Sequence, residues 1–126
     1  MSGATLAGLR VLVVEDEMLV SLLIEDMLAE EQCVIVGPFD RVSDALAAAT
    51  CESIDLAVLD VNIGGMKVYP IAEILAARHI PFLFLSGYGR QAIPSDRPGW
   101  RVCSKPFRPE ELVTMLIEQM QARTGR

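Results

Sequence analysis

The sequence is poor in the residues that build most metal centres and catalytic triads. His79 is the only histidine, and Cys33, Cys51 and Cys103 are the only cysteines, with no Cys-x-x-Cys pair among them. A metal cluster built from several histidines within this chain is therefore excluded. An odd number of widely spaced cysteines is typical of reduced, structural thiols and not of a disulfide framework.

Long apolar segments and an excess of positive charge are also missing. No run approaches the roughly 20 apolar residues that span a bilayer, and residues 1–6 lack the basic and apolar regions of a secretory signal. We therefore expect a cytoplasmic protein without membrane insertion. The net charge of −6 argues against a nucleic-acid partner, because such a surface needs clustered Lys and Arg side chains.

No repeat, low-complexity stretch or Gly/Ser/Pro-rich linker divides the 126 residues. A chain of this length has the size of one ordinary domain. Its hydrophobic content of 52% is ample for a buried core. We therefore expect a single domain over 1–126, with its core at about 8–122 and no output domain attached.

Short apolar runs alternate with segments of helical periodicity. The runs predict five buried strands, at 9–14, 33–36 (stopped by Gly37-Pro38), 55–60, 82–85 and 100–103. Apolar residues at helical spacing predict four helices, at 17–31, 43–50 (beginning near Arg41), 68–78 and 109–121. Segment 89–97 is unfavourable for a helix, because Pro94 lies inside it and Pro98 follows it.

Two of these helices carry a marked apolar stripe, which we interpret as the buried face. In 17–31 the acidic residues lie on the other side of the helix, and the stripe consists of Leu19, Leu22, Leu23, Met27 and Leu28. In 109–121 the stripe consists of Leu112, Val113, Leu116, Ile117 and Met120.

Five strands alternating with helices indicate an α/β protein with a parallel sheet covered on both faces. In such sheets, ligands bind beyond the carboxyl ends of the strands, where the strand order reverses. The chemistry of the protein should therefore lie in the residues that follow each strand.

Reactive side chains occupy these positions. Glu15 and Asp16 follow the first predicted strand, Asp60 ends the third, Ser86 follows the fourth, and Lys105 comes after the fifth. Taken singly, an acid after a strand is usually a helix cap, and Ser-Gly is usually a turn. All five at one sheet edge are much harder to attribute to chance, so we interpret them as one site.

The charges indicate what such a site binds. Two negative charges about 4 Å apart repel by roughly 4 kcal/mol at an effective dielectric near 20, so three carboxylates would raise their pKa values or bind a cation. Oxygen ligands favour Mg²⁺ or Mn²⁺. With that metal, the Asp60 carboxylate can act as a nucleophile and form an acyl phosphate. Lys105 and Ser86 can then bind the transferred oxygens.

Four segments of the chain resemble the defining motifs of response regulator receiver domains. They are Val-Leu-Val-Val-Glu-Asp-Glu at 11–17, Leu-Asp-Val-Asn-Ile-Gly-Gly-Met at 59–66, Leu-Ser-Gly at 85–87 and Ser-Lys-Pro-Phe at 104–107. The resemblance covers essentially the whole chain, in the family's order and spacing. It implies a flavodoxin-like, doubly wound five-stranded parallel sheet of strand order 2-1-3-4-5, with helices on both faces.

The resemblance also implies a magnesium site. Asp60 is the phosphorylated aspartate, and Asp16 is a direct ligand of Mg²⁺ (or Mn²⁺). Glu15 is expected to bind the metal through water, and the Asn62 carbonyl is expected to be a further ligand. Glu17 is expected to matter little, as an acid in the first turn of a helix.

The remaining motif residues bind phosphate by resemblance. Lys105 pairs with the phosphoryl group, and Ser86 stands where the family has Thr or Ser. The Lys105-Pro106 peptide bond is expected to be cis, an isomer that essentially only X-Pro bonds populate.

The sequence departs from the family pattern at three places. Glu15 replaces the more usual Asp, and Val102 stands three residues before Lys105, where many receivers have a switch Tyr or Phe. Phe-Leu-Ser-Gly-Tyr-Gly at 84–89 resembles an aromatic-x-Thr-Gly-Tyr subgroup often linked to histidine kinases of the HWE kind.

We therefore expect a phosphorylation-dependent switch of a two-component system. Its phosphodonor would be a sensor histidine kinase, and it would act on a downstream protein partner or a histidine phosphotransfer domain, as a monomer or weak homodimer. It would not be an enzyme beyond its own phosphorylation and dephosphorylation. A phosphate sink or a relay intermediate in a phosphorelay remains an alternative within the same family.

Two alternatives come from other classes of protein. A flavodoxin-like cofactor-binding module would need a Gly/Ser/Thr-rich phosphate loop after the first strand, where this chain has acids. A metal-dependent phosphatase with an aspartyl nucleophile would need a second acid two residues after Asp60, where this chain has Asn62.

Overall fold

The computed structural model of the protein describes residues 5–124. Residues 1–4 and 125–126 of the expected single domain lie outside the described residues, and so does most of the stretch 1–6 that lacks the features of a secretory signal. Five strands form the main sheet: β1 (Arg10–Val14), β2 (Val34–Phe39), β3 (Leu56–Asp60), β6 (Phe82–Ser86) and β7 (Val102–Ser104).

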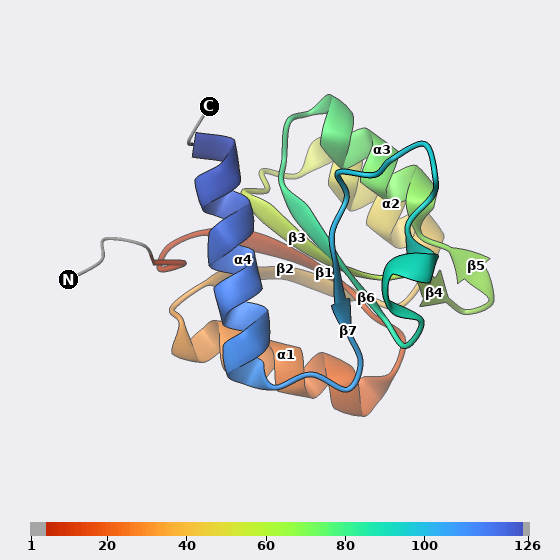
Figure 1. Ribbon diagram of the computed structural model, residues 1–126. Helices are drawn as coiled ribbons and strands as arrows, with labels where there is room; N and C mark the ends of the chain where they lie inside the picture. Colours follow the sequence, from red (N-terminus) through yellow and green to blue (C-terminus); the bar gives the residue numbers. More distant parts are fainter. Residues whose placement is uncertain (1–4, 125–126) are drawn as a thin grey trace.

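The main sheet has the order β2-β1-β3-β6-β7, and every pair in it is parallel. This is the predicted order 2-1-3-4-5. Figure 1 shows the helices on both faces of the sheet. One face is covered by α1 (Met18–Glu30) and α4 (Pro109–Thr124), the other by α2 (Val42–Cys51) and α3 (Tyr69–Ala77). Between residues 5 and 124, no helix is long and apolar enough to cross a membrane.

The central strands are buried on both faces. Every residue of β3 and β6 is buried, because each strand pairs on both sides and lies under helices on both faces. Continuous apolar runs such as Leu56–Asp60 favour this position over an edge. The side chains that end these strands are thus attached to the centre of the sheet.

The edge strand β2 is longer than its apolar run predicts. Gly37-Pro38 was expected to stop it at Val36, but β2 continues to Phe39 through a cis Gly37-Pro38 bond. An edge strand tolerates the missing proline N–H, and the β1–β2 register shifts at this point. At Gly37 (φ +109°) a Cβ would lie 2.9 Å from Phe39, so no side chain fits there without displacing its neighbours.

A short hairpin between β3 and α3 was not predicted. It consists of β4 (Asn62–Ile63) and β5 (Met66–Lys67), which pair antiparallel. Gly64 and Gly65 form its turn with φ of +57° and +83°, the backbone that favours glycine in two-residue hairpins. The Gly-Gly pair was therefore the sequence signal for this hairpin.

The predicted buried face of α1 is wrong in part. Met27 and Leu28 are buried as expected, but Leu19, Leu22 and Leu23 are 81%, 48% and 40% exposed. Ser21 and Ile24 take their place against the sheet. The first half of α1 is apolar on two sides, so periodicity alone selected the wrong stripe. The predicted inner stripe of α4 is correct, since Leu112 and Leu116 are buried and its other members pack against them.

The chain between β6 and β7 forms no α-helix, in agreement with the prolines in it. It contains only the 3₁₀ turn η1 (Gly89–Ala92). Trp100 was expected in the last strand but lies before it, since its N–H donates to the Arg97 carbonyl in a turn. The Trp100 ring packs edge-on against Phe82 and Phe84, with centroids 5.2 and 5.5 Å away.

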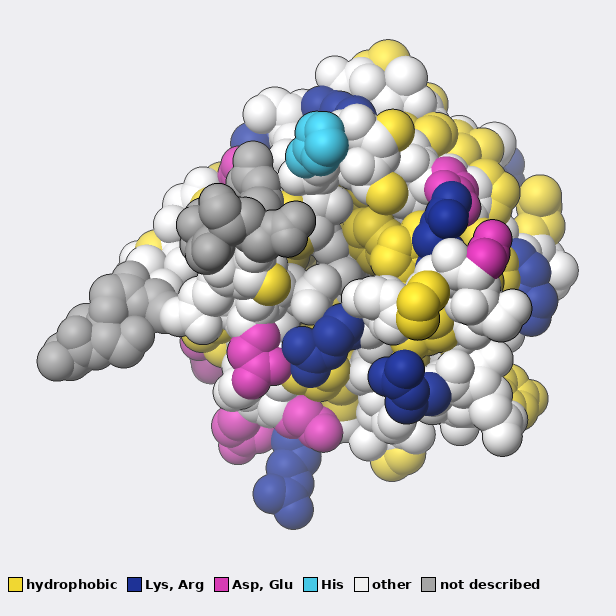
Figure 2. All heavy atoms as spheres, turned by 45° about the horizontal axis from the view of Figure 1, so that its top comes forward, with side chains coloured by type: hydrophobic (Ala, Val, Ile, Leu, Met, Phe, Trp, Pro, Cys, Tyr) yellow, Lys and Arg dark blue, Asp and Glu magenta, His cyan; other side chains and the backbone are white. Residues whose placement is uncertain are grey.

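This segment is held at more points than its composition suggests. The Tyr69 hydroxyl donates to the Ala92 carbonyl, and Arg97 pairs with Glu73 while lying 5.3 Å from the centre of the Trp100 ring. In Figure 2 a group of hydrophobic side chains lies in a hollow of the visible face, with charged side chains at its edge. Aromatic packing thus covers part of the sheet where a helix is missing.

Candidate functional site

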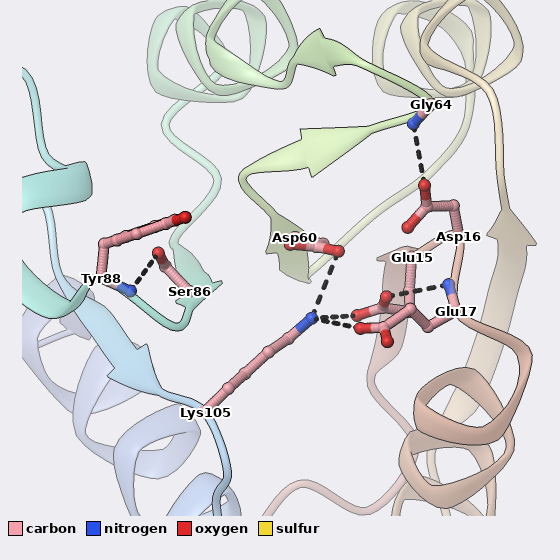
Figure 3. A network of polar contacts seen from close by, with 8 residues as sticks. All are labelled: Glu15, Asp16, Glu17, Asp60, Gly64, Ser86, Tyr88 and Lys105. Atoms are coloured by element: carbon pink, nitrogen blue, oxygen red, sulfur yellow. Dashed lines mark hydrogen bonds and ion pairs between the residues drawn. The ribbon is translucent and has the colours of Figure 1, made fainter.

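The carboxyl ends of four strands bring the predicted side chains together (Figure 3). Asp60 ends β3, Glu15 and Asp16 follow β1, Ser86 ends β6, and Lys105 follows β7. A cleft of about 350 Å³ opens between them and is lined by Asp16, Glu17, Asp60, Asn62, Ser86, Gly87, Tyr88 and Lys105.

The carboxylates form a compact acidic group. Ligand oxygens of Glu15, Asp16 and Asp60 all lie within 4.8 Å of one another. Glu15 and Asp60 are only 2% and 7% exposed, whereas Asp16 is exposed. The Gly64 N–H of the hairpin turn donates to Asp16 Oδ2 over 2.8 Å and orients this carboxylate. Three acids at such distances repel one another and favour a bound cation.

Glu15 shows most clearly that these acids need a counter-charge. Its pKa is raised to about 7, mainly by burial and in part by Asp60 beside it, against the lowering effects of the Glu17 N–H and of Lys105. That N–H donates to Glu15 Oε2 over 3.1 Å. Glu15 Oε1 is buried without a hydrogen bond, although the Lys105 ammonium lies 3.3 Å away as an ion pair. A buried oxygen with spare acceptor capacity suits a metal or a metal-bound water.

The donor set fits Mg²⁺ or Mn²⁺. Carboxylate oxygens dominate it, and the cleft leaves room for water. Asn62 also lines the cleft, but its side-chain Oδ1 accepts a hydrogen bond of 2.7 Å from Lys67. Its side chain is therefore engaged elsewhere, which is consistent with a backbone carbonyl as the expected ligand.

Lys105 lies among three carboxylates. Its Nζ is 3.3 Å from Glu15 Oε1, 3.2 Å from Glu17 Oε1 and 3.3 Å from Asp60 Oδ2. Burial lowers the pKa of Lys105, but Glu15 and Asp60, with the hydrogen bond to Glu17, outweigh burial and raise it. The ammonium therefore stays charged, as required of a group that binds a phosphoryl oxygen.

The opposite side of the cleft carries hydroxyl groups. Ser86 is buried, and its Oγ accepts a hydrogen bond of 3.0 Å from the Tyr88 N–H. Tyr88 is 71% exposed, and in Figure 3 its side chain extends past Ser86 toward the cleft. The Ser86 Oγ thus has one donor partner in the loop, and its O–H remains available to donate to an acceptor in the cleft.

Glu17 contradicts the expectation that it would be an ordinary first-turn helix acid. It is the N-cap residue of α1 and uses its carboxylate for the Lys105 ion pair, with no side-chain cap hydrogen bond. The run Glu15-Asp16-Glu17 contained a signal for this role, because all three acids lie in the short connection between the end of β1 and the start of α1. The cis Lys105-Pro106 bond is confirmed.

The three cysteines are free, as the sequence indicated. Burial raises the pKa of Cys33 and of Cys103 to about 11. These two thiols therefore remain protonated at neutral pH and are poor nucleophiles.

A doubly wound sheet with an acidic group, a lysine and a hydroxyl at its carboxyl edge defines a receiver-type signalling protein. The sequence confirms this class, because residues 11–117 match the response regulator receiver domain family. The chain belongs to that family, which functions in two-component signalling and typically uses magnesium and aspartyl phosphorylation.

Solved structures place the chain among known receivers. SdrG from Sphingomonas melonis Fr1 is 37% identical to this chain, with a TM-score of 0.75. The match covers 95% of this chain and 98% of SdrG. The response regulator PhyR from Brucella abortus is 22% identical, with a TM-score of 0.85 over 97% of this chain. This chain spans about half of PhyR (51%), and at that identity the likeness shows the fold alone.

A third solved structure contains the metal. The receiver domain of the sensor histidine kinase PA1611 from Pseudomonas aeruginosa PAO1 has a magnesium ion coordinated in its active-site cleft. It is 23% identical, with a TM-score of 0.73 over 90% of this chain and 98% of its own. A search of curated protein sequences gave no match.

Proposed function

We propose that this protein accepts a phosphoryl group from a sensor histidine kinase onto Asp60 and changes conformation to modulate a protein partner. The observation that carries the proposal is the position of Asp60. Its carboxylate is nearly buried at the end of a central strand, in contact with Lys105 and beside two further acids. Of the carboxylates that contact Lys105, Asp60 is the one that ends a central strand and also lines the cleft.

The chemistry requires little from the protein beyond positioning and charge. An Asp60 oxygen attacks the phosphorus of a phosphohistidine, the P–N bond breaks, and the imidazole nitrogen takes up a proton. Mg²⁺ would supply the charge that lets an anionic donor approach the acids. Asp16 and Asp60 would hold it directly, Glu15 through water, and Asn62 through its backbone carbonyl.

A protein phosphodonor is supported by the surface beside the cleft. Met18, Leu19 and Leu22 of α1 are exposed, and Met18 and Leu22 line a hollow that also contains Asp16. Exposed apolar groups gathered at one place commonly mark protein–protein contacts. A helical partner that covered them would bring its histidine to the mouth of the cleft.

The conformational response would start at Ser86. Its hydroxyl would leave the Tyr88 N–H and donate to a phosphoryl oxygen, and the freed N–H would let segment 87–98 move. Lys105 would exchange carboxylate partners for the phosphoryl group. A Lys105→Ala variant should therefore still take up phosphate but fail to change conformation.

We further propose that the protein acts as a stand-alone, cytoplasmic domain. The stand-alone character is supported by SdrG, because the match covers 98% of the SdrG chain. Three free cysteines are consistent with a reducing compartment. Its activity would be limited to its own phosphorylation and dephosphorylation.

Mass spectrometry after incubation with Mg²⁺ and acetyl phosphate tests the proposal. One phosphoryl group should add to the wild-type chain and none to Asp60→Asn. Asp44→Asn is a matched control, because this exposed acid lies on α2 and does not line the cleft. An adduct that persists in Asp60→Asn would show that another residue is the acceptor. Phosphotransfer profiling against the histidine kinases of the source genome would then identify the donor.

A further inference from the structure

The Lys105 ammonium contacts Glu17 as closely as it contacts the acceptor Asp60. All three carboxylate oxygens around it are at 3.2–3.3 Å, and the contact with Glu17 is also a hydrogen bond. Glu17 lies outside the compact acidic group formed by Glu15, Asp16 and Asp60. Its carboxylate therefore has Lys105 as its partner and no evident share in a metal site.

The backbone of Glu17 is fixed while its side chain is free to leave. The Glu17 N–H donates to Glu15 Oε2, and its carbonyl accepts the Ser21 N–H in the first turn of α1. Its side chain is 64% exposed, compared with 19% for Lys105. The carboxylate thus stands at the mouth of the cleft, where it can hold the ammonium or turn into solvent without disturbing the helix.

A phosphoryl group on Asp60 would compete with Glu17 for the same ammonium. Phosphoryl oxygens carry between one and two negative charges near neutral pH, and a fixed carboxylate nearby repels them. We propose that Glu17 is a positioning residue that retains Lys105 in the unphosphorylated protein and so opposes the phosphorylated state. This role rests on the proposed function and concerns the rate at which Asp60 is phosphorylated and dephosphorylated.

The decisive variant is Glu17→Gln, which keeps the size and an acceptor oxygen but removes the charge. With Mg²⁺ and acetyl phosphate, it should be phosphorylated about two- to fivefold faster, or lose the group that much more slowly. This range is what a partly exposed ion pair can contribute. Glu30→Gln, an exposed acid near the other end of α1, is the control and should match wild type. Thermal melting of both variants reports any loss of fold.

A double variant separates an effect through Lys105 from a general charge effect. If Glu17 acts by retaining Lys105, Glu17→Gln should change nothing further in a Lys105→Gln background. A gain of the same size there would overturn the role and leave only repulsion of the donor. Nitrogen-15 NMR of the Lys105 ammonium, recorded without phosphodonor, should shift in Glu17→Gln and not in Glu30→Gln.

The outcome also separates this inference from the function on which it rests. A wild-type chain that takes no phosphoryl group would sink the proposed function, and the role of Glu17 with it. Normal wild-type phosphorylation, with unchanged rates in Glu17→Gln, would overturn the role of Glu17 alone.

Discussion

The two sides of the cleft are built differently. Glu15, Asp16 and Asp60 extend from β1 and β3, which pair with neighbours on both sides and lie at the centre of the sheet. Ser86 and Tyr88 lie where β6 passes into segment 87–98, which has a single 3₁₀ turn and no α-helix. The acidic side is therefore fixed, and the hydroxyl side is attached to the least regular part of the described chain.

This difference separates chemistry from response. A metal and a phosphoryl group need ligands in constant positions, which central strands provide. A conformational signal needs a segment that opens at lower free energy than the central strands, which a loop with little regular secondary structure provides. We expect changes on the acidic side to alter binding and stability strongly, and changes on the hydroxyl side to alter local motion.

Metal affinity should give the largest effect, on the acidic side. Asp16→Asn should weaken Mg²⁺ binding about a hundredfold, since one unit charge near a divalent cation is worth several kcal/mol even at an effective dielectric near 20. Glu15→Gln should weaken it less, because Glu15 is expected to act through water. Titration followed by NMR measures both. Equal affinity in Asp16→Asn and wild type would remove Asp16 from the site.

The pH dependence of stability should reveal the buried Glu15 in the metal-free protein. Its pKa rises from 4.5 to about 7 on folding, so the folded protein binds this proton more tightly than the unfolded chain does. Its contribution to stability is therefore full below pH 4.5 and is lost as the pH rises to 7. Relative to Glu15→Gln, wild type should lose about 3 kcal/mol over this interval. Urea unfolding at several pH values measures the difference, and parallel curves would contradict it.

The aromatic cluster should give a smaller effect, on the hydroxyl side. Trp100→Ala removes edge-on contacts with Phe82 and Phe84. A half-buried ring should cost about 1.5 kcal/mol, less than the 3–5 kcal/mol of a fully buried one. Hydrogen exchange should increase mainly in segment 87–98. An increase spread evenly over β1 and β3 would mean that the two sides are not independent.

Phosphorylation itself should change the overall stability least. Its effect on hydrogen exchange should be confined to a small part of the chain. Beryllofluoride, a phosphoryl analogue, should change hydrogen exchange in segment 87–98, with Tyr88 changing exposure most. The fixed acidic side should show little change beyond the ligand residues. Unchanged protection over 87–98, with change concentrated elsewhere, would rule out this segment as the moving part.

The site was predictable because parallel strands end at one edge. Apolar runs located β1, β3 and β6, and the rule that ligands bind beyond strand ends then selected Glu15, Asp60 and Ser86 without three-dimensional information. The contact between Lys105 and Asp60 follows from the same rule, and Lys105 Nζ lies 3.3 Å from Asp60 Oδ2.

What the sequence did not predict depends on side-chain direction. Leu19 and Leu22 of α1 are apolar but face solvent, because the helix presents Ser21 and Ile24 to the sheet instead. Glu17 looked like a helix acid, and only its N-cap position turns its carboxylate toward Lys105. One residue of offset on a helix rotates a side chain by about 100°, more than periodicity can resolve at a helix start.

The packing of Trp100 makes the protein an optical reporter of its own state. Trp100 is the only tryptophan, and its ring contacts both Phe82 and the guanidinium of Arg97, which belongs to the segment expected to move. A nearby cation and the local polarity both act on the emission of an indole. Emission from this chain therefore samples a single environment, and kinetics at that ring can be followed in real time without a label.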